Sequence, residues 1–232
     1  MKSIYSRSKY TLPKKNMLLI FLLFAMAALT ACSSGSSTST ASGGSNNSTN
    51  LTALTGVFLD SPVEGLHYQT DTISGFTGEN GTFMYHDGET VTFSIGTVML
   101  GSAPANHIMT PIDLVPGAFD ETHPTVTNMI RLLQSLDWDG DLTNGIMITE
   151  TMHAEMTGRM IDINQGVNQF EDYDMEALFN SLNILGAFHN EEHMGLRSIS
   201  EAQEHFRQTL MSDMHPDDST FGQGRGGHMM GW

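Results

Sequence analysis

Two hydrophobic periods follow one another along the chain after residue 53. Residues 90–95 alternate, with Val91, Phe93 and Ile95 on one face, and other short apolar runs before residue 115 are separated by glycine, asparagine and proline. A period of two predicts half-buried strands, and we count about six of them. From Thr122 onward apolar residues recur every three or four positions, which predicts helices. We therefore predict an α+β fold, with a small antiparallel β-sandwich at 54–115, a bundle of about four short helices at 116–213 and a disordered tail at 214–232.

Turn and capping residues place the ends of several of these elements. Asn80-Gly81 lies between the apolar runs 75–77 and 82–85, and this dipeptide is typical of a tight β-hairpin. Among the helices, Ser198 with Glu201 three residues later forms a capping box. The first predicted helix begins with Thr125 as its N-cap, and the second runs near Thr149–Met160. The third spans about Asp174–Leu185 and ends at Gly186, and the fourth starts at Ser198.

The segment around the Asn80-Gly81 turn resembles a known family. Residues 75–83, Gly-Phe-Thr-Gly-Glu-Asn-Gly-Thr-Phe, look like the G-x-T-d-x-N-G-x-F turn of prealbumin-like, carboxypeptidase-regulatory-type β-sandwiches, with Gly78 in place of the usual acidic residue. The wider run 57–96 is similar to N-terminal modules of secreted and surface bacterial proteins. The resemblance implies a structural or adhesion-type module without catalysis.

The N-terminus carries the features of an export signal. Basic residues precede an apolar run from Met17 to Leu29, which is shorter than a comfortable membrane span. Leu29-Thr30-Ala31-Cys32 resembles the lipobox of bacterial lipoproteins, and Cys32 is the only cysteine. The resemblance implies that residues 1–31 are removed and that Cys32 is lipidated. It also implies that Ser33, where an aspartate would retain the protein in the inner membrane, favours the outer membrane. Residues 32–53 then form a Ser-, Gly- and Thr-rich tether, and the membrane face occupied stays open.

Removal of this signal leaves a strongly acidic chain. All 26 acidic residues lie after residue 31, whereas every lysine lies before it. This balance disfavours a nucleic-acid partner, because binding phosphates needs a basic face, and it favours divalent cations. Without lysine or a free thiol, the chain has no P-loop lysine, Schiff base or cysteine nucleophile, and we expect no enzyme. The basic residues that remain are Arg131, Arg159, Arg197, Arg207 and Arg225.

An acidic loop after the first predicted helix is the leading candidate site. Asp137, Asp139 and Asp141 alternate, and Asn144 follows three residues later. Calcium prefers six to eight oxygen ligands, and the spacing resembles the start of EF-hand and dockerin-type loops. No glutamate stands at the twelfth position, which is Ile148, so we predict a looser calcium loop. The alternative is a polar turn between two helices.

Histidine and methionine residues suggest a second kind of metal site. His189 and His193 are spaced to share one helical face, and His228-Met229-Met230 lies in the predicted tail. Imidazole and thioether groups suit copper or zinc, so a copper- or zinc-binding lipoprotein is the alternative function. The order H-x-x-E-H over 189–193 also matches inverted zincin peptidases formally, although a plain histidine-rich loop gives the same pattern. Most methionines fall at predicted core positions, where they serve as adaptable apolar filler.

Overall fold

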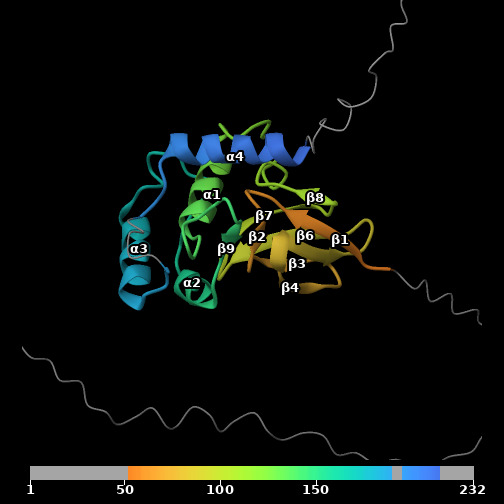
Figure 1. The fold of residues 1–232 in the computed structure, drawn as a ribbon, viewed down its shortest axis with the longest axis horizontal. Coiled ribbons are helices and arrows are strands. Elements are labelled where there is room, and N and C mark those ends of the chain that lie inside the picture. The colour runs from red at the N-terminus through yellow and green to blue at the C-terminus, as the bar shows by residue number, and fades with distance from the viewer. Residues whose placement is uncertain (1–51, 190–194, 215–232) are drawn as a thin grey trace, which may run out of the picture. The chain divides into compact units, whose positions relative to one another are not determined.

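The computed structural model describes residues 52–189 and 195–214, and its fold is α+β, as the hydrophobic periods predicted (Figure 1). Among the residues it describes, no helix combines the length and apolar character needed to cross a membrane. The strands are β1 (Leu54–Phe58), β2 (Val63–Glu64), β3 (His67–Gln69), β4 (Ser74–Phe76), β5 (Thr82–Tyr85), β6 (Thr90–Ile95), β7 (Val98–Pro104), β8 (Ile108–Met109) and β9 (Ile146–Met147). The helices are α1 (Pro124–Ser135), α2 (Glu150–Met156), α3 (Tyr173–Leu185) and α4 (Ile199–Met214), with a short 3-10 turn, η1, at Glu79–Gly81.

Two sheets form the β part. One has the strand order β5-β1-β8 and the other the order β4-β3-β6-β7, and all pairs are antiparallel except β1 with β8. Aromatic side chains join the two sheets, with the ring of Phe93 4.6 Å from that of Phe58 and 5.3 Å from that of Phe83. The buried faces of both sheets therefore share one aromatic core, as in a sandwich.

The Asn80-Gly81 hairpin prediction is wrong. Both residues adopt the left-handed backbone that the dipeptide favours, with φ values of 60° and 71°. However, the strand before the turn, β4, pairs with β3, while the strand after it, β5, pairs with β1 in the other sheet. The turn therefore carries the chain from one sheet to the other, because each strand finds its partner elsewhere in the fold.

A strand from the helical half of the chain also joins the β part. Strand β9 pairs in parallel with β2, with Val63 opposite Ile146 and Glu64 opposite Met147. The periodic analysis did not predict this two-residue strand, since two residues are too few to show a period. The pairing fixes the segment that follows α1 against the turn that follows β1.

The helices begin within about two residues of their predicted positions, and α2 ends at Met156, four residues before the predicted Met160. Asp172 caps α3, Gly186 ends it in the left-handed conformation at φ 64°, and Ser198 accepts the Glu201 backbone N–H at the start of α4. Thr125 is not the N-cap of α1, which begins one residue earlier at Pro124. Proline is favoured at that first position because the N–H it lacks would have no helical partner.

Helix α1 is the centre of the helical part. Every residue from Thr125 to Ser135 is buried. Helix α4 packs on α1, α3 packs on α2, and α2 also contacts β6; Figure 1 shows α4 crossing one end of α1. Buried apolar side chains from strands and helices form one continuous cluster. The helices and sheets of the described part therefore share one core.

Candidate functional site

The Asp loop, residues 137–145, connects the end of α1 to β9. The Trp138 backbone N–H donates to the Met147 carbonyl at 3.0 Å, and the Met147 N–H donates to Asp137 Oδ1 at 3.0 Å. These two bonds close the loop at its base. Because β9 pairs with β2, the loop lies at the junction between the helical part and the β part.

Asp137 is the buried carboxyl of this loop. Its side chain is 1% exposed, and its second oxygen, Oδ2, has no hydrogen-bond partner among the described residues. Burial raises the pKa of Asp137 to about 6, and the neighbouring carboxylate of Asp139 raises it further against the opposing effect of the Met147 N–H. A bound cation in place of the Asp137 proton would offset both the burial of the carboxylate and its repulsion by Asp139.

The other predicted ligands make bonds inside the loop. Asp139 Oδ1 accepts the Asp141 N–H at 3.0 Å, and its Oδ2 accepts from the side-chain amide of Asn144 at 2.9 Å. These bonds lower the pKa of Asp139, with the Asn144 bond contributing most. Asp141 Oδ1 accepts both the N–H and the hydroxyl of Thr143. The structure thus joins Asp137, Asp139 and Asn144 and directs one oxygen of Asp141 to Thr143, in the manner of a polar turn.

The described residues do not form a ready-made metal-binding cluster. Within residues 52–189 and 195–214, no group of three or more histidine, cysteine, aspartate or glutamate side chains is arranged to hold an ion. A hollow of about 210 Å³ does lie beside the loop, and its walls include Asp139, Asn144, Glu64, Glu79 and Asn80. Sequence reasoning missed Glu64 and Glu79, because only the folding of β2 and η1 against the loop brings them near it.

The copper or zinc residues are mostly outside the described part. The ring of His189 lies tilted against that of Trp138, with centroids 4.7 Å apart, and the His189 backbone N–H donates to the Trp138 carbonyl at 2.7 Å. It is therefore placed beside the Asp loop. His193, His228, Met229 and Met230 lie outside the described residues, as do Glu192 of the zincin-like pattern and the lipidation residue Cys32.

A second polar cluster, around Ser61, was not foreseen from the sequence. Ser61 Oγ lies 2.8 Å from Nε2 of His205, and it donates to the Leu142 carbonyl at 3.0 Å. The serine proton therefore points to a carbonyl, and the histidine N–H donates to the serine oxygen. A serine nucleophile needs the opposite direction of donation and an exposed hydroxyl, whereas Ser61 is buried. The pair instead anchors α4 to the Asp loop and to the turn after β1.

The resemblances to bacterial lipoproteins and to prealbumin-like β-sandwiches stay predictions after comparison with known proteins. No protein family, curated protein or solved structure matches the chain. A function must therefore be inferred from the residues themselves. Among the predicted sites, the Asp loop is the one that the structure describes most fully.

Proposed function

We propose that this chain is a lipoprotein of the outer membrane, anchored through Cys32, with a non-enzymatic structural or adhesion-type role that calcium supports. The observation that carries the calcium part is the buried carboxyl of Asp137. One of its oxygens has no hydrogen-bond partner among the described residues, and the carboxylate of Asp139 lies next to it. A bound cation at this position would tighten the junction between helices and sheets.

The chemistry of the loop suits a weakly held, hard cation. A carboxylate has about four lone-pair positions, so the bonds that Asp137 and Asp141 make inside the loop leave room for metal contacts at both. Calcium accepts such irregular sets, because it takes carboxylate, carbonyl and water oxygens in flexible geometry. Glu64 and Glu79, which line the hollow beside the loop, add further negative charge there.

The proposed anchor rests on the lipobox resemblance at residues 29–32, and the charge of the chain supports it. After residue 31 the chain holds five arginines against 26 acidic residues, so its surface is repelled by anionic lipid. Acyl chains on Cys32 must then supply the attachment. Mass spectrometry of the membrane-extracted protein should show a lipidated N-terminal Cys32. A membrane-extracted mature chain that begins at Cys32 and carries no acyl groups would contradict the anchor.

Thermal unfolding of the chain from residue 33, first in chelator and then with excess calcium, tests the calcium part. A ligand at a hundred times its dissociation constant stabilises by about 2.7 kcal/mol, which raises the melting temperature of a domain of this size by roughly 5–10 °C. Asp139→Asn should lose this shift, whereas Asp87→Asn, in an exposed turn, should keep it. A shift that survives in Asp139→Asn would place calcium elsewhere. A response to copper or zinc alone would favour the histidine and methionine alternative.

A further inference from the structure

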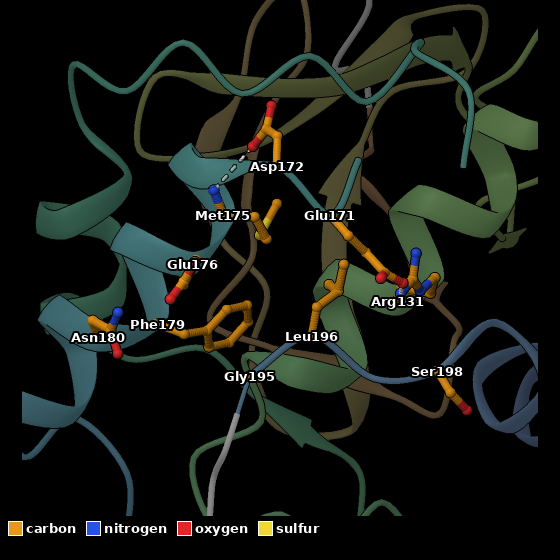
Figure 2. Close-up of a pocket in the computed structure, with 10 residues that line it drawn as sticks. All are labelled: Arg131, Glu171, Asp172, Met175, Glu176, Phe179, Asn180, Gly195, Leu196 and Ser198. Atoms are coloured by element: carbon orange, nitrogen blue, oxygen red, sulfur yellow. Dashed lines mark hydrogen bonds and ion pairs between the residues drawn. The ribbon is translucent and has the colours of Figure 1, made fainter. Parts of the chain in front are cut away.

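A separate cavity of about 420 Å³ lies between α3 and the segment that leads into α4 (Figure 2). Helix α1 contributes Arg131 to its wall. The volume falls within the range of about 300–1,000 Å³ that small-molecule sites occupy. The cavity and the Asp loop share no residue.

The floor of the cavity is apolar. Met175 and Phe179, which belong to successive turns of α3, are buried, and Leu196 is partly buried opposite them. Figure 2 shows the Phe179 ring with Met175 above it and Leu196 to its right. Such a floor accepts an apolar group of about the size of an aromatic ring.

Arg131, the one cation among the described residues that line the cavity, is already neutralised. Arg131 is 1% exposed, its Nε donates to the Arg197 carbonyl at 2.7 Å, and its guanidinium forms an ion pair with the carboxylate of Glu171. A ligand anion would have to displace Glu171, which the chain holds close to Arg131 at high effective concentration. Anionic ligands are therefore disfavoured.

The rest of the charge in the wall is negative. The carboxylate of Asp172 caps α3 and accepts hydrogen bonds from the backbone N–H groups of Asp174 and Met175. Glu176 is exposed at the rim, and its carboxylate forms no ion pair with any described residue. One helical turn further along, Asn180 adds an amide oxygen on the same side. The rim is thus suited to a positive group next to the apolar floor.

We propose that this cavity binds a small organic cation, an ammonium group carried on an apolar or aromatic body. The body packs on Met175, Phe179 and Leu196, and the ammonium lies between the Phe179 ring and the carboxylate of Glu176. No lysine occurs after Lys15, so the described part has no ammonium of its own to occupy this position.

Methyl NMR of the full chain in nonionic detergent tests this proposal. The probes are phenethylammonium and 3-phenylpropanoate, which share an apolar body and carry opposite charges. The methyl signal of Met175, assigned with Met175→Leu, should shift saturably with the cation and not with the anion. The Met109 signal, from the core behind β8, serves as the control within the molecule and should stay unchanged.

A charge variant then locates the ammonium. Glu176→Gln should weaken binding about two- to five-fold, as expected for one exposed ion pair, and raised salt should reduce the difference. Glu150→Gln, on the exposed side of α2, should leave the affinity unchanged. The proposal is overturned if the anion shifts Met175, if neither probe does, or if both variants bind like the wild type.

Discussion

Gly81→Ala tests the crossing of the chain between the two sheets. Gly81 has φ 71°, and a Cβ atom there would lie 2.6 Å from the Phe58 carbonyl oxygen and 2.9 Å from the Val63 nitrogen. Both are backbone atoms, fixed by β1 and β2, so neither can rotate away. Gly88 is the matched control, because its φ is 84° and a Cβ there would meet nothing within 4 Å.

The two substitutions should differ by the cost of the collision. Placing alanine in the left-handed region costs about 1–2 kcal/mol at either position. Forcing an extra methyl against packed atoms costs a further 1–3 kcal/mol, so Gly81→Ala should destabilise by roughly 2–5 kcal/mol in total. In melting temperature, each kcal/mol corresponds to about 2–4 °C for a domain of this size.

Urea unfolding of both variants, followed by circular dichroism, measures the difference. The urea concentration at the unfolding midpoint should fall for both variants, and much further for Gly81→Ala. The dependence of the unfolding free energy on urea concentration should stay unchanged. If Asn80-Gly81 were an exposed hairpin turn, as its sequence alone suggests, the two variants would lose equal stability. Equal losses would therefore refute the crossing between sheets.

Two further predictions concern pH. Asp137→Asn should stabilise the protein in chelator at pH 7.5 by about 3 kcal/mol, because burial raises the pKa of the folded carboxyl from 3.8 to about 6 and deprotonation at neutral pH opposes folding. The wild type should recover that difference as pH falls through 6 towards 4, and a difference in urea midpoints that stays constant with pH would count against the assignment. His153 accepts the Gly96 N–H at 2.9 Å and donates to the Gly65 carbonyl at 2.7 Å, while burial, with a smaller effect from His67, lowers its pKa below the ordinary value of 6.5. The stability that neutral His153 gives the folded protein should be complete above pH 6.5 and be lost as pH falls through the lowered folded pKa. His153→Gln should therefore lose less stability than the wild type between pH 7 and pH 5. Parallel curves of unfolding free energy against pH for the two proteins would argue against this role.

The sequence predicted part of the candidate site, and the tertiary structure decided the rest. The order Asp137, Asp139, Asp141, Asn144 predicted a compact polar loop, and the structure has one whose side chains bond to neighbouring backbone and side-chain groups. Burial of Asp137 was not foreseen, because an aspartate after a helix is ordinarily exposed. It is buried because β9, which follows the loop directly, pairs with β2 and closes the loop against the core.

The cavity beside α3 had no signal in the sequence at all. Met175 and Phe179 lie one helical turn apart in the helix predicted over about 174–185, and both are buried. Their place in a cavity wall depends on Arg131 of α1 and on Leu196, which the helical period does not relate to α3. The burial of Arg131 likewise follows from α4 and the segment before it covering α1.

The sequence by itself determined the α+β class, the alternation of β6, the ends of α3 and the start of α4. These features depend on residues within about four positions of one another, through side-chain period and capping bonds. Only the tertiary structure decided that the Asn80-Gly81 turn joins two sheets, that β9 pairs with β2 and that α1 is buried on every side. Strand partners and the covering of a helix depend on contacts between distant segments, and a local pattern is compatible with many such arrangements.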